Sequence, residues 1–365
     1  MRVLLFIDNL GAGGAQRQFC GLACMLKQHG YIVKVVTYYN DPFYLPLLRN
    51  ENVTYECFNN KKSYYSLSCL LKSMKNFEAN LVISFQTTPN FLACIACSIL
   101  HIPLIVSERN THLNISVKDR IILNFYRFAD FVVPNSYSEK TYLSKHFSFL
   151  KNKIHTISNF VDLQRFSYPK RVFERNNKKV LVVASVRSSK NTKGFIEACR
   201  IAIDSGCTSQ FIWYGVNPAA IEYSMDNIYT QECRELIKSY NLSDKILLLD
   251  KRKDIENAYQ DADIFCLPSF FEGTPNVICE AMASGLPVVC SSVCDNPIFV
   301  KSNENGLLFD PHDIPNMAEV LMTISLMDNS TLSKWGSKSR QIVEELCDEQ
   351  TFVHKYIDLV KIFKK

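Results

Sequence analysis

Two glutamates, Glu272 and Glu280, lie eight residues apart in a segment whose composition predicts a strand, a loop and a helix. Glu272 falls in the loop at the mouth of the helix, and Glu280 falls inside the helix. Since each helical residue advances the chain by about 1.5 Å, Glu280 is expected roughly 9 Å along the helix. Carboxylates so far apart cannot chelate one small ion, but they can hold the two ends of one elongated ligand. The free N–H groups of the first helical turn favour an anionic group between them.

The elements around these glutamates follow from cap and turn chemistry. The apolar run Ile264–Leu267 predicts a buried strand. Thr274 suits the N-cap of a helix and Pro275 its first position, where the missing N–H of proline is not needed. We expect the helix to end near Ser284, with Gly285 as its stop. The strand end and the helix start therefore meet where parallel sheets bind their ligands.

A glycine-rich loop follows the first apolar run of the chain, directly after Asp8. Gly11 and Gly13 match the first two glycines of a dinucleotide-binding fingerprint, but Gln16 stands where the third would be. We therefore do not expect nicotinamide-dinucleotide binding. A loop whose backbone N–H groups approach a phosphate or a sugar is the favoured interpretation, and a purely structural tight turn is the alternative.

The segment from Glu272 to Val288 resembles the hallmark of retaining glycosyltransferase family 4, Glu-x7-Glu followed by Gly-x-Pro-Val. Three further segments are similar to parts of that family: the opening Gly13-Gly14, the junction Asn159–Phe166 and the late run Asn305–Leu308. The resemblance implies an α/β fold of the GT-B class, in which two Rossmann-like, doubly wound parallel-sheet domains face each other across a cleft. Within the family, the chain looks most like enzymes that extend undecaprenyl-linked sugars for surface polysaccharides or protein glycans.

The resemblance assigns roles to the two glutamates and to two cations. Glu272 is expected to contact the donor sugar, and Glu280 to hold the ribose hydroxyls of the nucleotide. Lys190 and Arg187 are expected to hold the donor diphosphate, although Ser185 occupies the position where the family usually has its arginine. Glu272, Lys190 and Arg187 are therefore the predicted catalytic residues. The other residues expected to bind the donor are Gly13, Gly14, Gly273, Thr274, Pro275, Asn276 and Val277.

On the acceptor side the resemblance rests on less specific residues. Many family members have a histidine near the acceptor, where this chain has Arg109, with Glu108 before it and His112 three residues further on. We expect these three residues to face the acceptor, and a local ion pair between Glu108 and Arg109 is the alternative. Asp261 and Asp263 have the spacing of a metal-binding motif, but they precede a buried strand and are expected to end a helix. The resemblance implies no metal, no other cofactor and no nucleic-acid partner.

Short apolar runs alternate with helix-like segments along the chain, which predicts parallel sheets buried on both faces. Strands are expected in the front half at Arg2–Ile7, Ile32–Thr37, Val53–Cys57, Leu81–Ser84, Leu104–Ser107, Phe131–Pro134 and Lys153–Thr156. The helices expected between them include Ala15–His29, Ser66–Phe77, Asn90–His101 and Ser138–Phe147. Strands are expected in the back half at Lys179–Ala184, Gln210–Tyr214, Lys245–Leu249, Ile264–Leu267 and Val288–Cys290.

The polar stretch Asn159–Lys179 interrupts this alternation and is expected to link two domains. Residues 1–165 would form an acceptor-binding domain and residues 166–349 a nucleotide-sugar-binding domain, each long enough to bury its own core. The helical tail, residues 350–365, is expected to return and pack on the first domain.

Composition further narrows the class of protein to which the chain can belong. Of the 365 residues, 47% are apolar and 21% charged. No apolar run approaches the roughly 20 residues that cross a bilayer. The run Val3–Ile7 is too short for the core of a signal peptide, so we expect a cytoplasmic protein. Most of the 14 cysteines lie in apolar stretches, which indicates buried structural thiols rather than disulfides or metal ligands.

Charge is divided unevenly along the chain. Residues 1–167 contain 18 Lys and Arg against 10 Asp and Glu, whereas the remainder contains 23 against 26. A basic front half can lie on anionic lipid headgroups, and a solvated basic face is the alternative. We expect peripheral association with an anionic membrane surface, at the inner face of the cell membrane.

The resemblance implies a retaining glycosyltransferase that moves a hexose or N-acetylhexosamine from a UDP-linked donor to a saccharide, expected on a polyprenyl diphosphate. Three alternatives belong to other classes: a sugar-nucleotide 2-epimerase of the same fold, a two-lobed periplasmic sugar-binding protein, and a non-catalytic subunit of a polysaccharide assembly complex. The lack of a signal-peptide core argues against the periplasmic protein.

Overall fold

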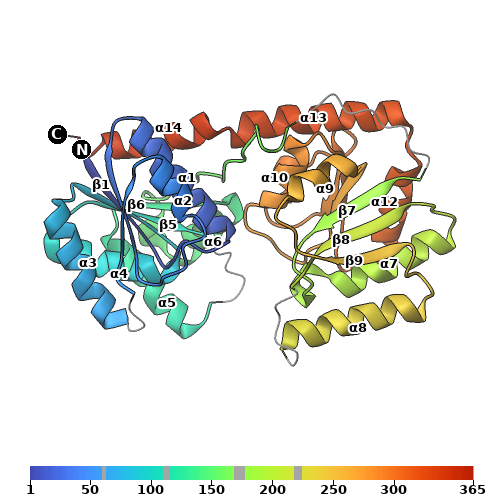
Figure 1. Ribbon diagram of the computed structural model, residues 1–365, viewed down its shortest axis with the longest axis horizontal. Coiled ribbons are helices and arrows are strands. Elements are labelled where there is room, and N and C mark those ends of the chain that lie inside the picture. The colour runs from blue at the N-terminus through green and yellow to red at the C-terminus, as the bar shows by residue number, and fades with distance from the viewer. Residues whose placement is uncertain (60–62, 110–114, 168–176, 218–223, 365) are drawn as a thin grey trace. The chain divides into compact units, whose positions relative to one another are not determined.

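The computed structural model describes residues 1–59, 63–109, 115–167, 177–217 and 224–364. The chain divides into two compact units, which are described separately (Figure 1). Unit 1 comprises Met1–Phe160 and Glu349–Lys365, and unit 2 comprises Val161–Asp348. The first boundary lies five residues before the expected one. In the expected linker, residues 159–167 contain turns but no strand or helix, residues 168–176 lie outside the described part, and Lys179 already begins the first strand of unit 2.

Unit 1 is built on a six-stranded, wholly parallel sheet in the order β3-β2-β1-β4-β5-β6. Its strands are β1 (Arg2–Ile7), β2 (Ile32–Thr37), β3 (Thr54–Cys57), β4 (Leu81–Phe85), β5 (Leu104–Glu108) and β6 (Phe131–Pro134). Its helices are α1 (Gly14–Gln28), α2 (Leu45–Asn50), α3 (Ser63–Phe77), α4 (Thr87–Leu100), α5 (Val117–Asn124), η1 (Phe125–Phe128), α6 (Tyr137–His146), η2 (Ser148–Leu150) and α14 (Glu349–Lys361).

Unit 2 repeats this architecture with the strand order β12-β11-β10-β7-β8-β9, again wholly parallel. Its strands are β7 (Lys179–Val183), β8 (Gln210–Val216), β9 (Ile246–Asp250), β10 (Ile264–Leu267), β11 (Val288–Ser291) and β12 (Gly306–Phe309). Its helices are η3 (Ser188–Lys190), α7 (Thr192–Asp204), α8 (Met225–Ser239), α9 (Ile255–Asp261), α10 (Asn276–Ala283), α11 (Asn296–Phe299), α12 (Ile314–Leu326) and α13 (Asn329–Cys347).

Each sheet separates two apolar cores, because successive strand side chains point to opposite faces. In β1, Val3 and Leu5 enter the core on one face, and Leu4 and Phe6 enter the core on the other. Strands buried on both faces have near-continuous apolar sequences. The expected α/β fold with two doubly wound parallel sheets is therefore confirmed.

The last helix, α14, packs in unit 1 beside α1 (Figure 1). Phe352, Val353 and Tyr356 are buried in the same core as Phe19 of α1. The ring of Phe352 lies 5.0 Å from that of Phe160, at the end of the first stretch of unit 1. Unit 1 therefore draws its core from both ends of the chain.

One expected strand is wrong. Lys153–Thr156 forms a single bridge, between Ile154 and Val132 of β6, rather than a strand. The turn that follows η2 occupies residues 151–153, so the strand cannot begin at Lys153, and the chain after the turn meets β6 through separate bonds such as that from the Ile157 N–H to the Pro134 carbonyl at 3.1 Å. Among the described helices, none has the length and apolar character that a bilayer crossing requires.

Candidate active site

The strand order of unit 2 defines where a ligand can bind. β7 and β10 are neighbours, but the chain leaves β7 toward β8 on one side and β10 toward β11 on the other. At such a topological switch point the connections part and leave a crevice beyond the carboxyl ends of the strands. The loop after β7, which carries Arg187 and Lys190, and the loop after β10, which carries Glu272, both lie at this edge.

Lys190 and Glu272 meet at this switch point. The Lys190 Nζ lies 2.6 Å from the Glu272 Oε1, and the Ser269 hydroxyl donates to the same oxygen at 2.6 Å. The side chains of Lys190 and Glu272 are 27% and 13% exposed, so the pair is largely shielded but still open to solvent. The Phe270 N–H donates to the Ser189 carbonyl at 3.1 Å and ties the two loops together.

Glu272 is held by a chain of buried hydrogen bonds behind it. The carbonyl of Ser269 accepts from the Ser291 hydroxyl at 2.6 Å, and the Asn296 amide donates to the Ser291 carbonyl at 2.9 Å. Ser269, Ser291 and Asn296 have no exposed surface. These bonds run from β11 and α11 to the loop after β10, and they fix the position of the glutamate.

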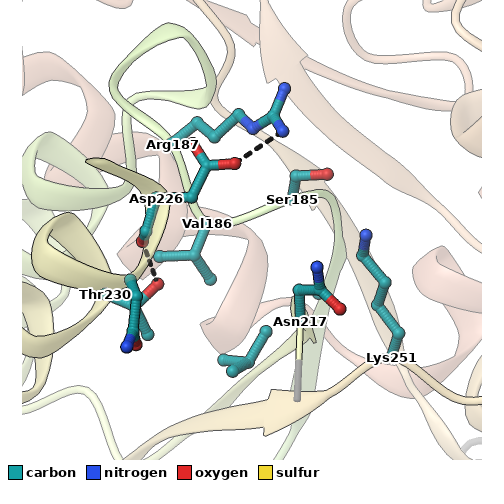
Figure 2. A pocket seen from close by; sticks show the side chains of 10 residues that line it. Ser185, Val186, Arg187, Asn217, Asp226, Thr230 and Lys251 are labelled. Atoms are coloured by element: carbon teal, nitrogen blue, oxygen red, sulfur yellow. Dashed lines mark hydrogen bonds and ion pairs between the residues drawn. The ribbon is translucent and has the colours of Figure 1, made fainter. Parts of the chain in front are cut away.

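Arg187 points to a different partner. Its guanidinium forms an ion pair with Asp226 of α8, with Nη2 2.6 Å from Oδ2, and both side chains are about half exposed. Figure 2 shows this pair at the rim of a pocket, with Ser185, Asn217 and Lys251 around it. The structure thus brings Lys190 to Glu272 but pairs Arg187 with a residue that the sequence analysis did not single out.

The pocket in Figure 2 depends on a close approach of β8 to the loop after β7. A Cβ on Gly215 would overlap the Ala184 carbonyl, so glycine is needed there. A second pocket adjoins the first and shares Ser185, Gly215 and Lys251 with it. It extends to Tyr214, Arg252, Ile255 and Val277. The two pockets lie along the carboxyl ends of β7, β8 and β9.

The start of α10 differs from the expectation. Pro275, not Thr274, is the N-cap, and the helix begins at Asn276. The reason is the backbone of Pro275, whose ψ of 84° is not helical, while its carbonyl already accepts from the Ile278 and Cys279 N–H groups. Thr274 is buried, and its carbonyl accepts from the Asn276 N–H at 2.9 Å.

Glu280 lies deeper than Glu272, in α10, and is only 5% exposed. The Tyr259 hydroxyl donates to its Oε2 at 2.9 Å. Tyr259 itself is fully buried between Phe166 and Phe265. The second glutamate is therefore set in place by an aromatic cluster, and Tyr259 is a supporting residue that the sequence analysis missed, because its contact depends on the packing of α9 against α10.

Glu108 and Arg109, which were expected to face the acceptor, form hydrogen bonds with other residues of unit 1. Glu108 has no exposed surface and accepts from the Thr87 hydroxyl at 3.1 Å and from the Arg109 N–H at 3.0 Å. The Arg109 guanidinium donates to Asn159 at 2.6 Å and to the Tyr356 hydroxyl at 2.7 Å. It also lies 4.3 Å from the centre of the Phe85 ring.

These bonds give both side chains a structural role that ties β5 to α4 and α14, and burial lowers the pKa of Arg109. The side-chain bonds of Arg109 go to Asn159 and Tyr356 rather than to Glu108. Whether Glu108 and Arg109 also serve the acceptor stays a prediction. His112 lies outside the described residues.

Other expectations concern metals and thiols. Asp261 ends α9, as expected, and pairs with Lys179, while Asp263 accepts from the Lys179 N–H. In the described parts of the chain, no three His, Cys, Asp or Glu side chains gather as a metal site. Eleven of the 14 cysteines are buried, as predicted, and burial raises the pKa of Cys94 to about 12.

Sequence reasoning also missed residues at the strand ends. Lys251 and Arg252 directly follow β9, and Asn217 directly follows β8. All three line the pockets of unit 2. Their place after predicted strands could have indicated them, because ligands in such sheets bind at the carboxyl ends. Asp226 gave no such signal, since it lies on a helix.

Two family models match the chain. The model of glycosyltransferase family 4 matches residues 12–165, and that of the glycosyl transferases group 1 matches residues 164–342. A galactosyltransferase of Escherichia coli, described as UDP-Gal:alpha-D-GlcNAc-diphosphoundecaprenol alpha-1,3-galactosyltransferase, is 24% identical over 72% of this chain and 71% of its own. A Campylobacter jejuni alpha-1,4-N-acetyl-D-galactosaminyltransferase, named for a diNAcBac-PP-undecaprenol-linked substrate, is 27% identical over 88% of each chain.

Solved structures share the whole fold. The Anabaena protein Alr3699/HepE in complex with UDP superposes with a TM-score of 0.86 at 20% identity, over 99% of this chain and 100% of its own. A glycosyltransferase from Rickettsia africae gives 0.85 at 18% identity, over 100% and 98%. The matches favour a transferase over the epimerase and the sugar-binding protein. The chain belongs to glycosyltransferase family 4, has the GT-B fold, and is an enzyme of the hexosyltransferase type.

Proposed function

We propose that the enzyme is a retaining transferase that moves a hexose or N-acetylhexosamine from a UDP-linked donor to a saccharide carried on a polyprenyl diphosphate. The observation that carries the proposal is the Lys190–Glu272 pair at the switch point of the unit 2 sheet. A cation and a carboxylate at one edge suit a donor that has an anionic diphosphate and a neutral sugar side by side.

Charge development in the reaction explains the cation. As the glycosidic bond breaks, the leaving diphosphate gains negative charge, and a preorganised cation lowers the barrier only if it binds that charge more strongly in the transition state. Lys190 is held at 2.6 Å by Glu272. When the donor binds, Lys190 exchanges this carboxylate for the diphosphate, and Glu272 becomes available to accept hydrogen bonds from the sugar hydroxyls.

Arg187 undergoes a similar exchange in the proposal. Its ion pair with Asp226 is about half exposed, and such pairs contribute little free energy, about 0–1 kcal/mol. A diphosphate can therefore displace Asp226 at small cost. Ser185, which stands at the usual arginine position, lines the same pocket as Arg187. This shared pocket supports the proposal that Arg187 serves the diphosphate from two residues further along.

Glu280 is the proposed partner of the ribose hydroxyls. A carboxylate has two oxygens with about four acceptor sites, so the bond from Tyr259 leaves capacity for further donors. The adjoining pocket, with Tyr214, Ile255 and Val277 in its wall, is the proposed place of the base. Uracil as that base is supported by one structural neighbour, which was crystallised in complex with UDP, and by one relative, which is named for UDP-Gal.

The acceptor and the membrane surface belong together in the proposal. The relatives' names refer to undecaprenyl-diphosphate-linked saccharides, which are anchored in a bilayer. In unit 1, Val117, Ile121 and Phe128 are exposed apolar residues with helical spacing on α5 and η1. Exposed Lys118, Arg120 and Arg127 flank them. Apolar residues between cations suit an anionic lipid surface.

The site assignment is tested by nucleotide release from UDP-sugars in the presence of lipid-linked acceptors. Lys190→Ala and Glu272→Ala are each expected to lower transfer at least about a hundredfold, the usual effect of removing one preorganised charge partner. Lys193→Ala is the matched control, because Lys193 follows in α7 but pairs with Glu232 on the surface. Transfer close to that of the unchanged enzyme in both site variants would contradict the assignment.

A further inference from the structure

Arg340, on α13, directs most of its hydrogen bonds to backbone carbonyls of other segments of unit 2. Its Nη1 lies 2.6 Å from the Ala283 carbonyl, 3.0 Å from the Phe166 carbonyl and 3.4 Å from the Leu163 carbonyl. Its Nε donates to Glu344, four residues further along α13, at 2.6 Å. The side chain is only 17% exposed. Arg340 therefore joins α13 to the end of α10 and to the stretch through which the chain enters unit 2.

The bond to Ala283 caps the helix that carries Glu280. Ala283 is the last residue of α10, and the final carbonyls of a helix have no partner within the helix. Turn bonds satisfy the three carbonyls before it, whereas the Ala283 carbonyl accepts from Arg340. A cation at this end of a helix also interacts favourably with the helix dipole. Arg340 therefore holds the end of α10, three residues beyond Glu280.

The backbones of α13 and of the turn after α10 approach closely, one helical turn before Arg340. A Cβ on Gly336 would overlap the Gly285 carbonyl, so glycine is needed there. Val343 of α13 is buried in the same core as Ile278 of α10. Because the two helices share a core and a close backbone contact, the position of α10 is set by α13.

A second path leads from Arg340 to Glu280 through two aromatic rings. Arg340 binds the Phe166 carbonyl, and the Phe166 ring lies 5.6 Å from the Tyr259 ring, edge to face. The Tyr259 hydroxyl donates to the Glu280 Oε2 at 2.9 Å. Phe166, Tyr259 and Glu280 are all buried. Glu280 is thus restrained at its backbone through α10 and at its carboxylate through Tyr259, and Arg340 belongs to both restraints.

We propose that Arg340 is a positioning residue for Glu280: it holds α10 and the Phe166–Tyr259 pair so that the Glu280 carboxylate faces the ribose hydroxyls of the donor. The inference rests on the proposed function, in which Glu280 binds those hydroxyls. Arg340 acts on the donor only through Glu280, since the carbonyl that it caps lies at the end of α10 opposite to Asn276. A binding group must be held within about 0.5 Å of its productive position, which explains the double restraint.

The test compares the affinities of the full chain for UDP and for 2′-deoxy-UDP by calorimetry. The unchanged protein is expected to prefer UDP at least about tenfold, because a site built for a hydroxyl rejects the analogue that lacks it. Arg340→Gln is expected to reduce this preference to about twofold or less, as Glu280→Ala does. Arg340→Gln added to Glu280→Ala is expected to cause no further loss of preference, since residues that act through one another are not additive.

Three further variants separate positioning from stability, with melting temperatures measured alongside. Glu344→Gln removes the half-exposed partner of Arg340 but leaves the carbonyl bonds, so it is expected to keep the preference for UDP. Leu321→Ala destabilises unit 2 in its other core, away from α10, and is also expected to keep it. Arg340→Lys retains the charge but not the planar fork of donors, so an intermediate preference is expected. It replaces Arg340→Gln if that variant does not fold.

Two sets of results would overturn the inference, and they are distinguishable. If Glu280→Ala loses the preference but the Arg340 variant that folds keeps it, the positioning role is refuted. The same holds if Leu321→Ala loses the preference as fully as Arg340→Gln does, because destabilisation alone would then explain the loss. If the unchanged protein shows no preference, or if Glu280→Ala keeps it, the ribose-binding role of Glu280 in the proposed function fails, and the inference fails with it.

Discussion

At the scale of single residues, the charged side chains of Lys190 and Asp8 have different kinds of partner. Lys190 is paired with an opposite charge, Glu272, which the donor diphosphate displaces in the proposed function. Asp8 is held only by neutral amides, so its charge remains uncompensated in the folded protein.

The uncompensated charge of Asp8 predicts a dependence of stability on pH. Because its pKa is raised in the folded protein, the native state binds more protons than the unfolded state between the usual carboxyl value of 3.8 and the raised value. Stability is therefore lost as the pH rises through this interval. Asp8→Asn is expected to raise the melting temperature at pH 7, and the gain is expected to shrink as the pH falls toward 4.

Thermal unfolding of both proteins across this pH range measures the effect. Asp41→Asn is the matched comparison, since the Asp41 carboxylate also raises the pKa of Asp8. It is expected to stabilise in the same direction by a smaller amount. A lower melting temperature of Asp8→Asn at pH 7 would mean that the carboxylate supports the fold, contrary to this prediction.

At the scale of elements, α5 and η1 combine an exposed apolar stripe with cations. Val117 is 78% exposed, which is unusual for an apolar residue, and it shares its stripe with Ile121 and Phe128. Val117→Ser with Ile121→Ser is expected to weaken binding to phosphatidylglycerol vesicles at all salt concentrations. Lys118→Gln with Arg120→Gln is expected to weaken it mainly at low salt, because screening at 0.1 M already limits charge interactions to about 10 Å.

Sedimentation with vesicles of phosphatidylcholine alone and of mixed phosphatidylglycerol distinguishes the two contributions. Leu326→Ser is the control, since Leu326 is an exposed apolar residue of unit 2, at the end of α12. It is expected to leave vesicle binding unchanged. Binding that does not respond to salt, or that Leu326→Ser weakens as much as the α5 variants, would contradict a lipid-binding role of α5.

At the scale of the whole molecule, unit 1 depends on a helix from the far end of the chain. Ile357 of α14 is buried in the unit 1 core, and truncating such a residue costs about 2–5 kcal/mol. Ile357→Ala is therefore expected to lower the melting temperature of unit 1 by several degrees and to leave the transition of unit 2 in place. Differential scanning calorimetry measures both transitions.

Leu321→Ala, in the core of unit 2, is the reciprocal control and is expected to lower the other transition. A single transition that shifts equally in both variants would show that the two units unfold together. In that case α14 would still stabilise the chain, but its effect would not be limited to unit 1.

Local chemistry in the sequence determined a large part of this protein. Eleven of the twelve predicted strands are present, since buried parallel strands are short, apolar and bounded by turns. The exception, Lys153–Thr156, fails because pairing depends on the turn before it. The observed starts of α3 and α4 lie three residues before the predicted ones. An N-cap such as Gln86 is not a residue type that predicts a helix start, because its side chain makes no capping hydrogen bond. The segment from Glu272 to Val288, together with three further segments, carries the resemblance to the family to which the chain belongs.

Only the tertiary structure decided which charged groups meet. The pairing of Lys190 with Glu272 joins loops 82 residues apart, and the pairing of Arg187 with Asp226 joins a loop to a helix. Glu108 and Arg109 also hold elements of unit 1 together, because Tyr126 and Tyr356 reach them from other helices. Asp8 and Gln86 come together because β1 and β4 are neighbours in the sheet. Strand order is a property of the folded chain, and local sequence does not contain it.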